Sequence, residues 1–269
     1  MQILEKVFVV TGAGNGIGRE LTLNILQKGG LVAGLDIHEK GLKETGSLAG
    51  KDADHYSWYV VDLTNRKAVE ALPKLVLQAH SVVDVVINNA GIIQPFMKIN
   101  DLPFDAIEKV MNINFYGVVN MTKSFLPHLL ERPEAHIVNV SSMGGFLPVP
   151  GQGVYGASKA AVKLFTEALY AELLHTNVHV SVVFPGGVGT NIANNSGVEM
   201  DVSVAEEGSQ SFNPLAPSAA AEQIIKGIQK NKFHILVGRD SKFMNLLFRL
   251  APKFATEFIT GKMGSLLGN

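Results

Sequence analysis

Three residues whose types suit proton transfer lie close together in the middle of the sequence. Tyr155 and Lys159 are four residues apart, a spacing that places both side chains on one face of a helix. A phenol titrates near pH ~10, and a neighbouring ammonium group lowers its pKa because the positive charge favours the phenolate. Ser142 ends an apolar run and offers a hydroxyl that can hydrogen-bond a carbonyl or alcohol oxygen held against Tyr155. These residues predict proton transfer to and from an oxygen bound to carbon.

The Tyr-x-x-x-Lys spacing is not specific by itself. Helices in many folds carry it without a catalytic role, so two interpretations stay open on the motif alone. The rest of the sequence must show whether the motif is catalytic or only part of an ordinary helix.

Composition narrows the class of protein and of partner. The chain has 269 residues, 46% hydrophobic and 17% charged, which predicts one globular α/β domain over residues 1–269. Its net charge of -1 points neither to nucleic acid nor to an anionic membrane. The absence of cysteine excludes disulfides and thiol catalysis and fits a reducing cytoplasm. No apolar run is long enough for a helix that spans a membrane.

Short runs rich in β-branched residues alternate with helix-length segments. Strands separated in this way are parallel and joined by right-handed crossovers, which predicts a doubly wound, Rossmann-like sheet with helices on both faces. Ligands bind such sheets beyond the carboxyl ends of the strands. The seven predicted strands are 6–10, 31–35, 56–61, 82–87, 136–140, 178–184 and 233–237.

Two segments depart from this alternation. Residues 189–218 form a long polar connection, which predicts a lid over the site, with disorder as the alternative. The tail, 240–269, carries apolar residues at helical spacing, and we expect that stripe to be buried across a subunit interface or over the substrate entrance. Peripheral membrane contact through the tail is the lesser alternative. The stripe consists of Phe243, Leu246, Leu247, Leu250 and Phe254.

A glycine-rich turn, Thr11-Gly-Ala-Gly-Asn-Gly-Ile-Gly18, follows the first predicted strand. Glycines there let backbone N–H groups approach a pyrophosphate at the start of the next helix, so a dinucleotide is the expected ligand, although a purely architectural turn is the alternative. Asp36 ends the second strand, where a carboxylate can accept both ribose hydroxyls and would repel a 2′-phosphate. The sequence therefore predicts NAD rather than NADP, unless Asp36 is only a turn or cap residue.

The order of these motifs resembles the classical short-chain dehydrogenase/reductase family over nearly the whole chain. The motifs that carry the resemblance are the T-G-x-x-x-G-x-G turn, the Ser, Tyr and Lys residues, Asn88-Asn-Ala-Gly91, Asn114, and Pro185-Gly186 with Val188 and Thr190. The resemblance implies a catalytic tetrad of Asn114, Ser142, Tyr155 and Lys159, in which Asn114 helps to hold a water that relays protons to Lys159. It also implies a dinucleotide site made by Gly12, Gly14, Asn15, Gly16, Ile17, Gly18, Asp36, Asp62, Asn89, Ala90, Gly91, Tyr155, Lys159, Pro185, Gly186, Val188 and Thr190.

The expected activity is interconversion of a secondary alcohol and a ketone with NAD(H), with Tyr155 as general acid and base and without a metal. Apolar residues near the tetrad favour a partly hydrophobic substrate: Ile92, Ile93, Pro95, Phe96, Met143, Phe146, Leu147 and Val149. The family commonly forms homodimers and homotetramers, and the tail is similar to those of its membrane-associated members. The alternatives are an NADP(H)-dependent carbonyl or 3-oxoacyl reductase and, from another class, an NAD-binding regulator without turnover.

Overall fold

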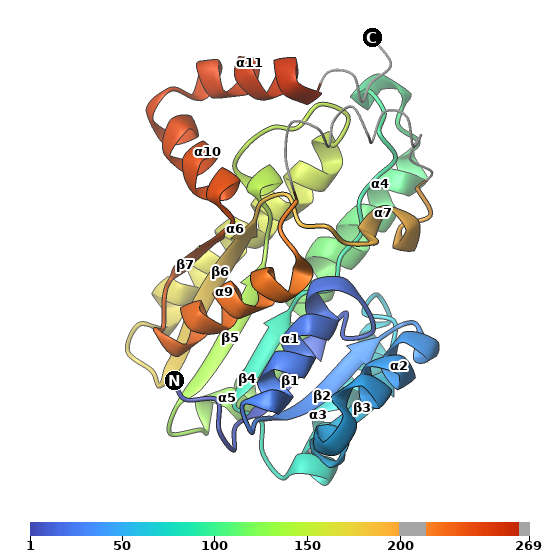
Figure 1. The fold of residues 1–269 in the computed structure, drawn as a ribbon, viewed down its shortest axis with the longest axis vertical. Helices are drawn as coiled ribbons and strands as arrows, with labels where there is room; N and C mark the ends of the chain where they lie inside the picture. Colours follow the sequence, from blue (N-terminus) through green and yellow to red (C-terminus); the bar gives the residue numbers. More distant parts are fainter. Residues whose placement is uncertain (199–213, 264–269) are drawn as a thin grey trace.

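The computed structural model of the protein describes residues 1–198 and 214–263, and its centre is a seven-stranded parallel sheet. The strand order is β3-β2-β1-β4-β5-β6-β7, so the winding direction reverses between β1 and β4 (Figure 1). Segments 199–213 and 264–269, which hold the middle of the predicted lid and the end of the predicted tail, lie outside the described residues. The strands are β1 Val7–Thr11, β2 Leu31–Asp36, β3 Tyr56–Val60, β4 Val85–Asn88, β5 Ala135–Val140, β6 Val178–Pro185 and β7 His234–Val237.

All seven predicted strands are present, and the predicted fold class is confirmed. The largest shift is in β4, which begins at Val85 and not at the predicted residue 82. The side chain of Asp84 explains the shift, because its Oδ2 accepts the Val7 N–H at 2.9 Å in place of a backbone carbonyl. Regular pairing with β1 therefore starts only after Asp84.

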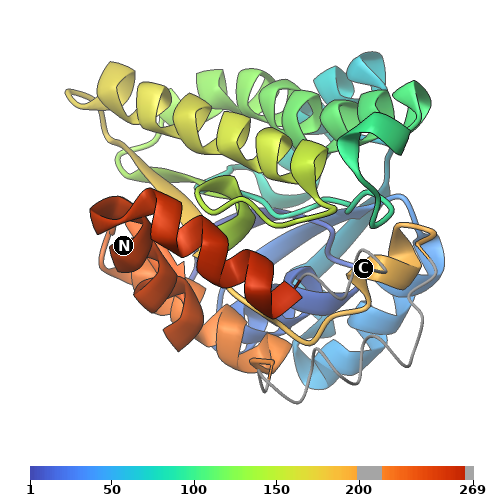
Figure 2. The same cartoon turned by 90° about the horizontal axis from the view of Figure 1, so that it is seen from above.

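Helices cover both faces of the sheet, and alternate strand residues pack against each layer (Figure 2). Phe8 and Val10 of β1 belong to the core on one face and Val9 to the core on the other, as the two-residue period of a strand requires. One layer contains α1 Gly16–Gln27, α2 Glu39–Ala49 and α9 Pro217–Gln229; the other contains α3 Arg66–His80, α5 Gly117–Leu130 and α6 Gly153–Leu173.

Shorter elements gather at the carboxyl end of the sheet. Helix α4, Phe104–Met111, runs through a π-helical turn, Asn112–Tyr116, into α5. A 3-10 turn, Met143–Gly145, precedes α6, and α7, Ile192–Asn195, follows β6. A parallel bridge joins Val188, the residue before the predicted lid, to Leu215, near the lid's end. Two further 3-10 turns are Gly50–His55 and Ile99–Asp101.

The tail forms two helices, α10 Arg239–Leu250 and α11 Pro252–Met263, beyond the carboxyl end of the sheet (Figure 1). Their inner faces pack on Leu147 in a small core with Met244, Ala255 and Ile259. Among the described residues, no helix is long and apolar enough to cross a membrane.

Within this chain, four of the five residues of the tail's apolar stripe are exposed, which contradicts their burial over the substrate entrance. Only Leu247 packs inward, beside Met244. The exposed residues are Phe243 (57%), Leu246 (60%), Leu250 (76%) and Phe254 (57%). The helix carries apolar residues on two sides, and the side with Met244 and Leu247 faces the protein. Burial of the outer side against a second copy stays a prediction.

Candidate active site

A cavity of about 310 Å³ lies at the carboxyl ends of the strands, where the winding direction reverses. It brings together most of the residues that the sequence predicted for cofactor and chemistry: Gly12, Asn15, Gly16, Ile17, Asp36, Asp62, Asn89, Ala90, Gly91, Ser142, Tyr155, Lys159, Pro185, Gly186, Val188 and Thr190. Three predicted residues lie behind this lining. Gly14 sits beneath Asp36, Gly18 packs on Gly12, and Asn114 is fully buried beside Gly91.

The glycine-rich turn has the shape of a phosphate cradle. Gly12 and Gly16 have φ angles of 70° and 53°, a region that side chains disfavour. A Cβ atom on Gly18 would collide with the Gly12 carbonyl, so glycine there permits α1 to start against the strand end. The Asn15 Oδ1 atom accepts the Gly16 N–H at 2.6 Å, and the positive end of α1 faces the cavity. The residues present therefore fit a dinucleotide pyrophosphate.

The Asn89 to Gly91 segment is fixed to the end of β1 by one threonine. Thr11 Oγ1 accepts hydrogen bonds from the Asn89 and Ala90 N–H groups at 2.9 and 3.0 Å. The Asn89 Nδ2 atom donates to the Thr11 carbonyl at 3.0 Å. The two glycine-containing turns are thus held together as one wall of the cavity.

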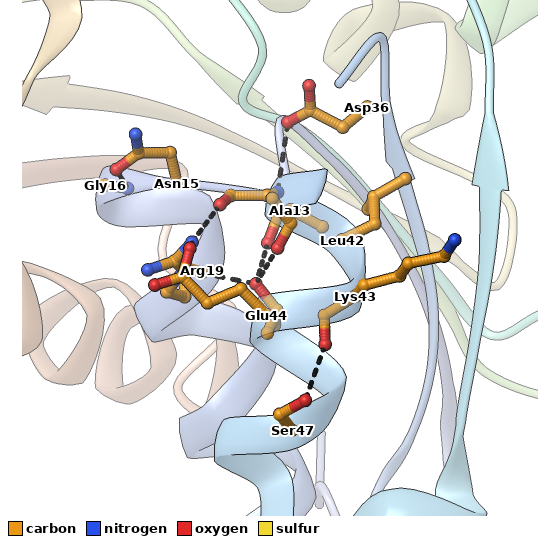
Figure 3. A network of polar contacts seen from close by, with 12 residues as sticks. Ala13, Asn15, Gly16, Arg19, Asp36, Leu42, Lys43, Glu44 and Ser47 are labelled. Atoms are coloured by element: carbon orange, nitrogen blue, oxygen red, sulfur yellow. Dashed lines mark hydrogen bonds and ion pairs between the residues drawn. The ribbon is translucent and has the colours of Figure 1, made fainter. Parts of the chain in front are cut away.

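Asp36 faces the cavity from the end of β2, and its carboxylate also accepts hydrogen bonds from the backbone. Its Oδ2 accepts the Gly14 N–H at 3.0 Å (Figure 3). Its Oδ1 accepts the His38 N–H, also at 3.0 Å. The turn role that the sequence left open is therefore real, and it holds the carboxylate at the cavity edge. Asp62 also lines the cavity, and its Oδ1 accepts hydrogen bonds from the Thr64 N–H and hydroxyl.

Arg19, the arginine beside this edge, is turned toward α2. Its Nη2 donates to Glu44 at 2.7 Å and its Nε donates to Thr45 Oγ1 at 3.2 Å (Figure 3). The Glu44 carboxylate offsets the positive charge of Arg19, which reduces the attraction that this arginine would offer to a 2′-phosphate.

Ser142 and Tyr155 come together at the opposite end of the cavity. The Ser142 Oγ accepts the Gly144 N–H at 3.0 Å, which fixes the serine at the start of the 3-10 turn. Burial raises the pKa of Tyr155, and a hydrogen bond with the Ser142 side chain opposes that rise. The sequence-based expectation of a lowered pKa caused by Lys159 is therefore wrong for this arrangement.

Lys159 explains the difference. Its side chain is 4% exposed, and its Nζ donates to the Val140 carbonyl at 2.9 Å. Burial lowers its own pKa to about 8, because an ammonium group loses hydration there. Its backbone carbonyl accepts the Ser141 hydroxyl at 2.7 Å, so the end of β5 holds both ends of the residue.

Asn114 is held inside by the π-helical turn between α4 and α5. Its Oδ1 accepts the Ile92 N–H and its Nδ2 donates to the Ile92 carbonyl, both at 2.9 Å, and Nδ2 also donates to Ser158 Oγ at 3.0 Å. A Cβ atom on Gly91 would lie 3.1 Å from Lys159 Nζ and 3.2 Å from Asn114 Oδ1. The asparagine and the lysine therefore approach the same glycine, and any side chain at position 91 would crowd both groups.

Few of the residues expected to bind an apolar substrate line the cavity. Ile92 and Ile93 do, and Ile113 and Ile192, which the sequence did not single out, join them. Met143, Phe146 and Leu147 pack instead beneath α10 and α11. The predicted apolar region near Ser142 is thus partly a small core that supports the serine.

Known proteins share much of this sequence. Residues 6–201 match the model of the short chain dehydrogenase family. The sequence is 38% identical, over 91% of this chain and 90% of the other, to SadH of Mycobacterium tuberculosis (strain ATCC 25618 / H37Rv), whose name assigns it only as an oxidoreductase. The chain belongs to the short-chain dehydrogenase family. It is also 36% identical to the 3-oxoacyl-[acyl-carrier-protein] reductase FabG of Thermotoga maritima, over 71% of this chain and 77% of that protein.

Solved structures of short-chain dehydrogenases share the fold. One from Burkholderia phymatum in complex with NAD has a TM-score of 0.83 and 26% identity, over 93% of this chain and 96% of that chain. A serine dehydrogenase complexed with NADP+ has a TM-score of 0.77 and 28% identity, over 86% of this chain and 93% of that chain. The protein is an oxidoreductase of CH–OH groups, and a pyridine nucleotide is its cofactor.

Proposed function

We propose that the protein interconverts a secondary alcohol and a ketone on a partly hydrophobic substrate, with NAD(H) as cofactor and Tyr155 as general acid and base. The observation that carries this proposal is the single cavity that holds Ser142, Tyr155 and Lys159 at one end and Asp36 at the other. The glycine turn after β1 and the Asn89 to Gly91 segment after β4 lie between them in the strand order, and the Pro185 to Thr190 segment after β6 also lines the cavity.

The cofactor would be held by the positive end of α1 at its pyrophosphate and by Asp36 at its adenosine ribose. A bound nicotinamide supplies the carbon that accepts or gives the hydride. Thr190 and the Pro185 to Val188 segment would surround that ring, and Asp62 would lie near the adenine.

The protein's own residues perform the proton steps. For reduction, Tyr155 donates its proton to the carbonyl oxygen as that oxygen gains charge, and the Ser142 hydroxyl hydrogen-bonds the same oxygen. The raised pKa keeps Tyr155 protonated at neutral pH, so the ground state suits reduction. For oxidation, the phenolate takes the alcohol proton, so the rate of alcohol oxidation should rise with pH.

Lys159 and Asn114 form the route by which Tyr155 recovers its proton. The Lys159 pKa of about 8 lets its ammonium group exchange protons near neutral pH. Lys159 Nζ and Asn114 Oδ1 both lie close to Gly91, and a water held by Asn114 beside Lys159 would complete the relay.

The cofactor preference rests on charge. Asp36 stands where a 2′-phosphate would meet a carboxylate, and Arg19 is paired with Glu44. The alternative is an NADP(H)-dependent carbonyl or 3-oxoacyl reductase; the identity to FabG supports a 3-oxoacyl substrate, and the serine dehydrogenase complexed with NADP+ supports NADP(H). Titrating both cofactors into the unmodified protein decides between them, and tighter NADP binding would favour the alternative.

The reaction is tested with a panel of apolar secondary alcohols and ketones, followed through the near-ultraviolet absorbance of the reduced nicotinamide. Tyr155→Phe keeps the ring and removes the hydroxyl, so it should abolish turnover while NAD affinity stays within a few-fold. Binding of NAD by the unmodified protein without turnover of any compound would favour the regulatory alternative. We also propose a homodimer or homotetramer, and light scattering checks the mass.

A further inference from the structure

The polar group that satisfies the start of the catalytic helix comes from a distant loop. Gln94 is fully buried, and its Oε1 accepts the N–H groups of Val154 and Tyr155 at 2.8 and 2.9 Å. Its Nε2 donates to the Gly151 carbonyl at 2.9 Å. One side chain therefore fixes both the loop before α6 and the backbone of Tyr155.

The first turn of a helix leaves backbone N–H groups without partners in the helix, and a side chain at the N-cap position usually accepts one of them. In α6 that position is Gln152, whose Nε2 donates to the Gln94 carbonyl at 2.8 Å. The residue at the N-cap position therefore bonds the Gln94 backbone, while the Gln94 side chain caps the helix from 60 residues away in the sequence.

The loop that carries Gln94 is itself anchored to the rest of the site. The neighbouring Ile92 is fixed by both polar atoms of the Asn114 side chain, and the Ile93 N–H donates to Ser196 Oγ at 3.0 Å. Gln94 is therefore held on a rigid support, and movement of its amide would move the Tyr155 backbone with it.

The choice of an amide has an electrostatic consequence. Aspartate and asparagine both cap helices well, and a carboxylate gains from the positive helix end. A negative charge beside Tyr155 would, however, disfavour the phenolate that alcohol oxidation requires. Gln94 supplies the acceptor without that charge.

We propose that Gln94 is a positioning residue for Tyr155: it sets the first turn of α6 and keeps its surroundings neutral. The proposal rests on the proposed function for its catalytic consequence. The chain provides a matched control in Gln152, which is also buried and at the same helix end. Its Oε1 has no hydrogen-bond partner within the described residues, so Gln152→Met removes one hydrogen bond and relieves an unsatisfied atom.

The first measurement needs no turnover. Amide hydrogen exchange should accelerate at Val154 and Tyr155 by about 10-fold or more in Gln94→Met, which is near in size and has no strong acceptor. Gln94→Glu retains the acceptor for both amides but places an oxygen where Nε2 donated to the Gly151 carbonyl, so amide protection should lie between those of Gln94→Met and the unmodified protein. Gln152→Met should leave the exchange at both amides nearly unchanged. Equal protection in Gln94→Met and the unmodified protein would overturn the cap.

The second measurement is the pH profile of kcat for alcohol oxidation. Gln94→Met should lower kcat by about 10- to 100-fold, since small misplacements of a catalytic group carry such costs, while NAD affinity stays within a few-fold. Gln94→Glu should recover most of that loss at high pH, with its alkaline rise displaced upward by about one pH unit.

The outcomes separate the two proposals. A Gln94→Met variant with lost protection and normal kcat would show a structural cap and refute the positioning role, as would a Gln94→Glu profile that is not displaced. Failure of the unmodified protein to turn over any alcohol or ketone would refute the proposed function and the positioning role with it, while amide exchange would still decide the cap.

Discussion

Replacing Asp36 with asparagine should change which nicotinamide cofactor the protein prefers. Two unit charges 4 Å apart repel by about 1 kcal/mol in water and by about 4 kcal/mol near a protein surface. Because the Asp36 side chain is partly exposed, we take about 1–2 kcal/mol for its repulsion of a 2′-phosphate. Asp36→Asn should therefore tighten NADP binding by about 5- to 30-fold.

The same change should weaken NAD binding. Hydrogen bonds to a charged acceptor contribute about 1.5–3 kcal/mol, against about 1 kcal/mol for a neutral one, so NAD affinity should fall by about 2- to 30-fold. Asparagine also has one acceptor where Asp36 uses two, for the Gly14 and His38 N–H groups. The thermal unfolding midpoint of each variant shows whether loss of a hydrogen bond to the backbone also destabilises the protein.

Asp62→Asn is the matched control, because Asp62 lines the same cavity and only one of its oxygens accepts the hydrogen bonds of Thr64. It should change the affinities for NAD and NADP by similar factors. Calorimetric titration of both cofactors at one fixed ionic strength gives the four affinities needed. An unchanged NADP-to-NAD ratio in Asp36→Asn, or an equal change of that ratio in Asp62→Asn, would refute the assignment of Asp36.

The other predictions concern burial. Lys159→Met should lose activity. In the wild type the free energy of unfolding should rise between pH 8 and 10.5, because in that range the lysine keeps its proton in the unfolded chain and loses it in the folded one. Lys159→Met should remove this rise, and an unchanged pH dependence in denaturant titrations would contradict the prediction. Burial, His179 and the terminal amine of Met1 lower the His136 pKa from 6.5 to about 3, so stability should fall as the pH drops from 6.5 toward 3. His136→Asn should unfold at lower pH than wild type, and an equal acid midpoint by circular dichroism would argue against this. Deletion from Ser241 onward uncovers Leu147 beside the serine turn and removes the exposed apolar side of the tail. The deletion should raise KM for apolar substrates or lower the oligomer mass, while NAD binding stays intact. Unchanged KM and mass would make the tail dispensable.

The features that sequence predicted well are set by local pattern. Seven β-branched runs between helix-length segments leave few arrangements other than a doubly wound sheet. The spacing of Tyr155 and Lys159, and the glycines between Thr11 and Gly18, likewise depend on residues close in sequence. The glycines follow the end of β1, and Tyr155 and Lys159 lie in the first turns of α6, after β5, so the topology brings both groups to the carboxyl edge of the sheet.

The features that sequence missed depend on contacts between distant residues. Helical spacing puts Lys159 beside Tyr155, but it does not show that the ammonium group donates to Val140 or that burial governs the phenol. No local motif marks Gln94, because its acceptor role exists only once its loop reaches α6. The sequence shows only a polar residue between Ile93 and Pro95, shortly after the Asn-Asn-Ala-Gly motif.

The tail shows a third kind of limit. Its apolar residues occupy two sides of α10, and hydrophobic periodicity alone cannot tell which side faces the protein. Packing against Leu147 decides in favour of Met244 and Leu247.

The most direct test of the central claim is reduction of NAD by a secondary alcohol, measured in parallel for the unmodified protein and Tyr155→Phe. We expect the unmodified protein to form reduced nicotinamide at a rate that rises with pH, because alcohol oxidation needs the Tyr155 phenolate and burial raises its pKa. Tyr155→Phe should bind NAD within a few-fold of wild type and form none. Substantial turnover by the phenylalanine variant at any pH would contradict the assignment of Tyr155 as the acid and base.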